Sequence, residues 1–245
     1  MIEIRGLRKE MERQVILDSV DLSLHDGETL TVVGISGCGK TTLLKLLMGL
    51  IEADGGSIRL DGEEISGYSE EEFNLYVRNQ MTMVFQQGAL WDSKTIRQNI
   101  DLALNLRKGL SLEERNRLIT ESLERVGLEG TGDMYPEELS GGMMKRAAIA
   151  RAIAAQPKYL LYDEPTTGLD PVLSKMVAEL IVKLDEELGT TSLVISNDVE
   201  NIQKFSDGVA MLHGGNIILT CEAGHMWDQE NETFNAFLHG TMESV

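Results

Sequence analysis

A glycine-rich segment that ends in a lysine and a threonine carries the clearest chemical signal in the sequence. It reads GISGCGKT from Gly34 to Thr41 and matches the pattern G-x-x-x-x-G-K-[ST]. An apolar stretch, Thr29 to Val33, precedes it, and a helical pattern begins at Lys40. Backbone N–H groups and a helix N-terminus would then converge on one point, which is how proteins bind phosphate. A chance glycine-rich turn would lack this strand–loop–helix context.

Two side chains of this loop have separate predicted roles. Lys40 would bring a positive charge to the β and γ phosphates of a nucleotide and is a candidate catalytic residue, and the Thr41 hydroxyl is placed to bind Mg²⁺. The residues predicted to bind the phosphates are Gly34, Ile35, Ser36, Gly37, Cys38, Gly39, Lys40, Thr41 and Thr42.

A pair of carboxylates follows a second apolar run. Tyr159 to Tyr162 is hydrophobic and is followed directly by Asp163 and Glu164. The carboxyl end of a buried strand in an α/β sheet faces the ligand crevice. We expect Asp163 to hold Mg²⁺ through water and Glu164 to polarise the attacking water. The alternative, that the two acids only begin a helix, does not account for the phosphate-binding pattern from Gly34 to Thr41.

A second glycine-rich segment, Leu139 to Met143 (LSGGM), stands at the start of a helical pattern. Ser140 is a suitable N-cap. An ordinary capped helix has no need for Gly141 and Gly142, which weaken a helix start. Glycines are useful there when a ligand must approach the backbone closely. The segment therefore predicts a second anion-binding helix terminus.

The elements that must position these residues form a mixed pattern. The first 30 residues alternate like short antiparallel strands, and buried strands are expected at Thr29–Val33, Tyr159–Tyr162 and Thr191–Ser196. Between them, residues 95–155 have a helical pattern. We find no internal repeat and no low-complexity linker. The prediction is one α/β unit over residues 1–245, with an antiparallel β segment first and an inserted helical region.

Composition excludes several classes of protein. The chain has 245 residues, with 22 basic and 40 acidic side chains and a net charge of −18. That charge argues against a nucleic-acid partner and against simple adhesion to anionic lipid. Two cysteines make no disulfide framework, and no apolar run approaches the roughly 20 residues that span a bilayer. We expect a cytoplasmic protein whose membrane role, if it has one, comes through another subunit.

The phosphate-binding loop, the LSGGM segment and the segment YLLYDEPTTGLD (Tyr159 to Asp170) occur in an order that resembles the ATP-binding cassette ATPases over essentially the whole chain. The resemblance implies a P-loop NTPase with a RecA-like core, an antiparallel β subdomain and a helical subdomain that carries LSGGM. It also implies ATP and Mg²⁺ as ligands, with Gln86 contacting the metal and Asp170 lying in the segment that crosses a dimer interface. The resemblance further implies a head-to-tail homodimer. In it, Ser140, Gly141 and Gly142 of one subunit would cap the γ-phosphate held by the other.

The chain departs from the family pattern at two places. Where family members usually have a histidine after a strand, this sequence has Asn197. An amide can donate a hydrogen bond to the γ-phosphate, but it cannot carry a proton as imidazole does. Asn197 is either a tolerated catalytic substitution or a cause of slow hydrolysis. The second departure is Met11, which stands where many cassettes stack an aromatic side chain on the adenine. Met11 is the candidate residue to pack on the base here, and the stem of Arg13 is the alternative.

Within the family, the finer resemblance is to the ATPases of bacterial phospholipid transporters of the maintenance-of-lipid-asymmetry (Mkl-like) type. It rests on the segments Met83–Ser93, Met134–Met143, Tyr162–Pro171 and Phe237–Gly240. It implies an integral permease in the inner membrane as a partner, with the cassette bound peripherally to its cytoplasmic side, and a lipid-binding protein with an MCE domain.

The segment Gln87 to Asn99 would then form much of the groove for the permease. Leu90, Trp91 and Ile96 are its candidate apolar anchors, unless they fill the core beneath the helical region. Three other interpretations stay open: an importer of amino acids, osmolytes or metals, a soluble cassette that acts on ribosomes or DNA, and a regulatory nucleotide-binding module with little turnover.

Overall fold

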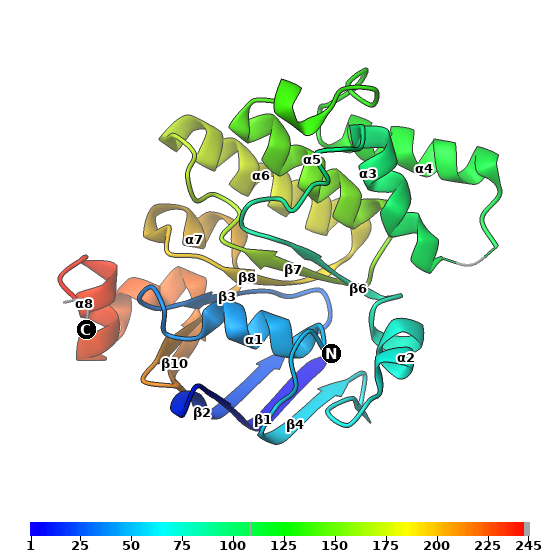
Figure 1. Cartoon of the computed structure of the whole chain (residues 1–245). Helices are drawn as coiled ribbons and strands as arrows, with labels where there is room; N and C mark the ends of the chain where they lie inside the picture. Colours follow the sequence, from blue (N-terminus) through cyan, green and yellow to red (C-terminus); the bar gives the residue numbers. More distant parts are fainter. Residues whose placement is uncertain (108, 243–245) are drawn as a thin grey trace.

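The computed structural model describes residues 1–107 and 109–242, and two sheets organise it (Figure 1). The larger has the order β10-β9-β3-β8-β7-β6, in which only β10 runs antiparallel to its neighbour. Its strands are β3 (Thr29–Val33), β6 (Met81–Val84), β7 (Tyr159–Asp163), β8 (Thr191–Ile195), β9 (Gly208–His213) and β10 (Asn216–Glu222). The smaller sheet is antiparallel with the order β2-β1-β4-β5, from β1 (Ile2–Met11), β2 (Gln14–Leu24), β4 (Gly55–Leu60) and β5 (Glu63–Glu64).

The central strands of the larger sheet are covered on both faces. β3, β7 and β8 are buried at every residue, which is typical of parallel strands that are covered on both faces. Helix α1 (Lys40–Leu47) lies between the two sheets (Figure 1). Its apolar side chains join the smaller sheet and one face of the larger sheet in a single core.

Helices cover the other face of the larger sheet. α3 (Ile96–Ala103), α4 (Leu112–Arg125) and α5 (Gly141–Ala154) come from the helical region, and α6 (Pro171–Leu188) and α7 (Val199–Phe205) follow β7 and β8 (Figure 1). Capping boxes at Thr95 and Ser111 begin α3 and α4, each satisfying two backbone N–H groups. Short helical pieces complete the chain: α2 (Glu70–Glu72), a π-helical turn (Phe73–Val77), 3-10 turns at Leu104–Leu106, Pro136–Glu138 and Ala223–Asp228, and α8 (Glu232–Leu238).

The predicted α/β architecture is therefore confirmed, with an antiparallel sheet and a helical region inserted before β7. The first strand, β1, extends to Met11, and α1 ends at Leu47 because Gly49 adopts a left-handed conformation with φ 62°. No described helix meets the length and hydropathy that crossing a membrane requires.

The topology explains how distant residues reach one place. β3, β6, β7 and β8 run parallel, so their carboxyl ends lie along the same edge of the sheet. Gly34 follows β3, Gln86 lies two residues beyond β6, Glu164 follows β7, and Asn197 lies two residues beyond β8. This edge is where ligands bind in open parallel sheets.

Candidate nucleotide-binding and hydrolysis site

A cavity of about 230 Å³ lies at this edge of the sheet. It is lined by Ile16, Ser36, Gly37, Gly39, Lys40, Thr41, Thr42, Gln86 and Glu164. The structure thus gathers the loop, the residue after β6 and the carboxylate after β7, as the sequence predicts. Gly34, Ile35 and Cys38 belong to the same loop but do not line the cavity.

The loop has little room for side chains on its inner side. A Cβ atom on Gly34 would lie 2.3 Å from the backbone oxygen of Leu212. Gly39 begins α1 with φ 109°, and a Cβ there would lie 2.9 Å from Leu17. These glycines let the chain turn from β3 into α1 while passing close to β9 and β2.

Lys40 lies folded against its own loop. It is only 5% exposed, and its Nζ donates hydrogen bonds to Gly34 O at 2.7 Å and to Ile35 O at 3.0 Å. The backbone carbonyls thereby stabilise the buried ammonium. Nearby, burial raises the pKa of the Cys38 thiol, and the positive charge of Lys40 opposes that rise.

The predicted metal ligands provide an oxygen-rich corner. Thr41 Oγ1 donates to Asp163 Oδ1 at 3.0 Å and to Oδ2 at 3.2 Å, and Gln86 lines the adjacent cavity. Burial raises the pKa of Asp163, and the Thr41 hydrogen bond opposes that rise. A hydroxyl, a carboxylate and an amide are donors that suit Mg²⁺, which completes its coordination with water and substrate phosphates. The residues present therefore fit a magnesium ion.

Glu164 is held from several directions. Its backbone adopts a left-handed conformation with φ 50°, which is uncommon for a residue with a side chain. Asn197 Nδ2 donates to its Oε1 at 2.8 Å, and Thr167 Oγ1 donates to its Oε2 at 2.5 Å. Its own N–H donates to Ile195 O at 2.9 Å. The carboxylate is thus oriented towards the cavity that contains Lys40.

Two residues of this arrangement were not predicted from the sequence. Thr167 stands three positions after Glu164, so the turn returns its hydroxyl to the carboxylate. Ile16 of β2 lines the phosphate-loop cavity, whereas Met11 does not and is 46% exposed. Ile16 therefore places an apolar side chain beside the phosphate loop.

The LSGGM segment lies apart from this cavity. Ser140 caps α5, its Oγ accepting from Met143 N at 3.3 Å, as the sequence predicts. Ser140, Gly141 and Gly142 are absent from the lining of the phosphate-loop cavity. Gly141 instead borders a separate cavity of about 350 Å³, beside Gln86 and Thr167.

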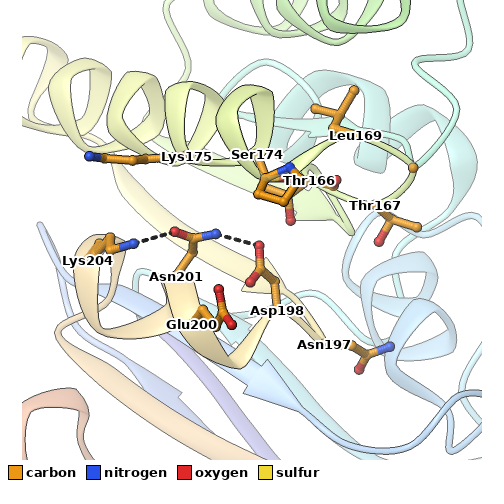
Figure 2. Close-up of a pocket in the computed structure, with 12 residues that line it drawn as sticks. Thr166, Thr167, Leu169, Ser174, Lys175, Asn197, Asp198, Glu200, Asn201 and Lys204 are labelled. Atoms are coloured by element: carbon orange, nitrogen blue, oxygen red, sulfur yellow. Dashed lines mark hydrogen bonds between the residues drawn. The ribbon is translucent and has the colours of Figure 1, made fainter.

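A larger cavity of about 510 Å³ lies between α6 and α7, with Asn197 at its border (Figure 2). Asn201 Nδ2 donates to Asp198 Oδ2 at 2.7 Å and its Oδ1 accepts from Lys204 at 2.7 Å. These polar groups satisfy one another, and the cavity includes neither the phosphate loop nor Glu164. The smaller cavity is therefore the candidate nucleotide site, despite its size.

The three candidate anchors of the predicted permease segment differ in exposure. Trp91 is 60% exposed and Leu90 is half-buried. Ile96 is completely buried in the core of the helical region, so of the two alternatives stated for it, it fills the core and is not exposed as an anchor. The buried Asn99 holds the segment in shape, accepting from Trp91 N at 2.7 Å and donating to Trp91 O at 3.1 Å.

Comparison with known proteins agrees with this geometry. The ABC transporter family matches residues 17–167. The methionine import ATP-binding protein MetN of Rhizobium johnstonii is 37% identical over 227 residues, which cover 93% of this chain and 61% of MetN. The chain thus spans about three fifths of the length of MetN. MlaF of Haemophilus influenzae, an intermembrane phospholipid transport ATP-binding protein, is 37% identical over 243 residues, covering 98% of this chain and 90% of MlaF.

Solved structures show the same fold. The cassette MJ0796, a dimer in a post-hydrolysis state with ADP and Pi, has a TM-score of 0.83 and 30% identity, and the match covers 91% of this chain and 99% of MJ0796. CbiO1 of Clostridium perfringens, part of an ABC transporter complex, has a TM-score of 0.84 and 26% identity over 94% of this chain and 91% of CbiO1. Its sequence, its fold and the site at the strand ends all agree: the chain belongs to the ABC transporter family of ATP-binding cassettes.

Proposed function

We propose that the chain is the ATP-binding and ATP-hydrolysing subunit of an ABC transporter. The observation that carries this proposal is the cavity that brings Lys40, Thr41, Gln86 and Glu164 together. Lys40 and the loop N–H groups bind the β and γ phosphates. Glu164, oriented by Asn197 and Thr167, positions a water molecule for attack on the γ-phosphate.

Thr41, Gln86 and Asp163 hold Mg²⁺ in this proposal. When bound, the ion would neutralise charge on the phosphate oxygens. The protein's own part is to place those three ligands beside the loop, and the Thr41–Asp163 hydrogen bonds keep the hydroxyl and the carboxylate together.

The working unit is a head-to-tail homodimer. Ser140, Gly141 and Gly142 do not line the phosphate-loop cavity of their own chain, so they are free to cap a γ-phosphate held by a second copy. The dimeric state of the related cassette with ADP and Pi supports this pairing. Asp170, which caps α6 through hydrogen bonds from Val172 N and Leu173 N, lies in the segment that would cross the interface.

A membrane permease is the proposed partner to which ATP hydrolysis is coupled. The exposed Trp91 and the half-buried Leu90 supply an apolar surface next to Gln86 in the chain. The cassette would then lie on the cytoplasmic face of the inner membrane, bound through the permease.

Phospholipid is the proposed cargo, and an MCE-domain protein the proposed second partner. The match with MlaF extends over 98% of this chain and 90% of MlaF, whereas MetN is matched over 61% of its length. The second candidate is import of another solute, because MetN is equally identical and an Fe(3+) import protein, FbpC of Pasteurella multocida, is 36% identical. Pull-down from membranes, followed by identification of the co-purified permease and lipid, distinguishes the two cargo classes.

The decisive test of the motor uses Glu164→Gln, which removes the proposed water-positioning charge. With ATP and Mg²⁺ this variant should elute as a dimer in size-exclusion chromatography with light scattering, while its hydrolysis falls at least about 100-fold. The matched control, Glu164→Gln with Lys40→Ala, should stay monomeric because the phosphates lose their charged partner. A monomer in both cases, or unimpaired hydrolysis in Glu164→Gln, contradicts the proposal.

A further inference from the structure

A buried lysine on the LSGGM helix links two parts of the site. Lys145 lies one turn into α5 and is 9% exposed. Its Nζ donates hydrogen bonds to the backbone oxygen of Gln86 and, at 3.3 Å, to the backbone oxygen of Glu164. One ammonium group therefore bridges the loop after β6 and the residue after β7.

The Glu164 carbonyl is one of the groups that define the unusual conformation of this residue. It accepts from Lys145 Nζ and from Thr167 N at 3.2 Å, while Glu164 N donates to Ile195 O at 2.9 Å. A left-handed conformation of a residue with a side chain persists only where surrounding contacts determine it. Lys145 contributes the contact that comes from the helical region.

The loop after β6 is held by the same helix at a second place. Gly88 and Ala89 have φ values of 75° and 48°, so the chain turns sharply there. Arg151, also on α5, donates to Gly88 O at 2.9 Å and to Ala89 O at 2.6 Å. The segment continues directly to the exposed Trp91. Two cations of α5 thus bind the carbonyls of the loop, and only Lys145 also reaches Glu164.

A buried ammonium with carbonyl partners could be a purely structural feature. Two observations favour a role in positioning. Burial lowers the pKa of Lys145, whereas the negative charges of Glu164 and Asp163 raise it, so the ammonium lies within the field of both functional carboxylates. Lys145 also borders the cavity that contains Gln86, Gly141 and Thr167.

We propose that Lys145 is a positioning residue that couples the Gln86–Ala89 loop to the carboxylate of Glu164. A displacement of the loop, such as a partner bound at Trp91 would cause, is transmitted to Glu164 by their shared ammonium. This inference rests on the proposed hydrolytic function, because it assigns the coupling to the water-positioning carboxylate.

The test compares Lys145→Met, which keeps length but removes the donor, with Lys145→Gln, which restores a donor. We expect kcat for ATP hydrolysis to fall at least tenfold in Lys145→Met, with KM changed less than threefold, and to recover in part in Lys145→Gln. Lys183→Met is the matched control: Lys183 is an exposed lysine of α6 whose ammonium pairs with Glu187. A purely structural lysine would change the melting temperature and leave kcat per folded molecule unchanged, which would overturn the proposal.

Hydrogen exchange followed by mass spectrometry provides a readout that needs no turnover. Thr167 N donates to Glu164 O, which is one of the two bridged carbonyls, and Gly88 N donates to Phe85 O in the turn that contains the other, Gln86 O. These amides therefore report on the two segments that Lys145 bridges. Peptides covering 85–89 and 164–169 should both exchange faster in Lys145→Met and not in Lys183→Met. Unchanged exchange in either peptide overturns the coupling. If the wild type hydrolyses ATP no faster than Glu164→Gln, the proposed function fails, and exchange alone still decides on Lys145.

Discussion

Asn197 Nδ2 donates a hydrogen bond of 2.8 Å to Oε1 of Glu164. The residue that replaces the family's usual histidine thus contacts the carboxylate directly, while Thr167 binds its other oxygen. A neutral amide can orient the carboxylate, but it cannot accept or release a proton at neutral pH. Asn197 therefore orients the carboxylate without the proton transfer that an imidazole could add.

Replacing Asn197 by histidine tests whether proton transfer is missing. We expect kcat for ATP hydrolysis to rise at least about threefold in Asn197→His, because a titratable ring can take up a proton near neutral pH. Asn197→Ala should lower kcat, since Glu164 loses a donor. Steady-state phosphate release measures both. An Asn197→His enzyme no faster than the wild type would show that the amide already suffices.

The hydroxyl of Thr167 should matter for turnover and not for binding. Thr167→Val removes the donor to Glu164 Oε2 at nearly constant volume. A hydrogen bond to a charged group contributes about 1.5–3 kcal/mol, and the exposure of Thr167 reduces that to about 1 kcal/mol. We expect kcat to fall about fivefold with ATP affinity unchanged. Thr167→Ser, which keeps the hydroxyl, should retain most activity, and equal losses in both variants would contradict the assignment.

Two glycines of the phosphate loop should respond differently to alanine. A Cβ at Gly34 would meet Leu212 O at 2.3 Å, a backbone atom that cannot move alone. We expect Gly34→Ala to cost about 1–3 kcal/mol in the free energy of unfolding from this contact, in addition to the roughly 1–2 kcal/mol of its positive φ, and to abolish ATP binding. At Gly37 a Cβ would meet nothing within 4 Å, so Gly37→Ala should cost only the roughly 1–2 kcal/mol of its positive φ. Urea unfolding followed by circular dichroism measures the free energy of unfolding of both variants. Equal losses in Gly34→Ala and Gly37→Ala would show that the contact with Leu212 is unimportant.

Alkylation of Cys38 should depend steeply on pH. Burial raises the pKa of its thiol above the usual 9.0, although the charge of Lys40 opposes that rise. A raised thiol pKa leaves little thiolate at pH 7, so the maleimide rate in Cys221→Ser protein should rise about tenfold per pH unit up to pH 9. ATP should slow the reaction, because Cys38 lies in the loop. A rate that levels off below pH 8 would show a lowered pKa instead.

The sequence predicted those parts of the site that depend on local pattern. The phosphate loop follows from its glycines and its strand–helix context, and Asp163 and Glu164 follow from their place after a buried strand. Contacts between distant segments were not predictable. Lys145 meets Gln86 and Glu164 only after α5 packs against the loop, and nothing in the spacing distinguishes it from a surface lysine.

The burial of individual apolar residues was likewise not predictable from the sequence. Ile96 and Trp91 are both large and hydrophobic in one segment, yet one is buried and the other 60% exposed. The helix face on which Ile96 lies decides this, and that face depends on where Thr95 begins α3. Likewise Ile16, rather than Met11, lines the cavity: Met11 pairs with Gln14 at the end of the β1–β2 hairpin, and Ile16 lies two residues beyond Gln14 along β2.

The ammonium of Lys40 has a further consequence for the energetics of nucleotide binding. Its bonds to Gly34 O and Ile35 O act as internal competitors for the phosphates. Binding is then an exchange of one set of acceptors for another, and affinity reflects the difference between the two sets rather than the whole strength of the lysine–phosphate contact. The loop also avoids the several kcal/mol that an unpartnered buried charge would cost. Its shape should therefore persist through each cycle of nucleotide release.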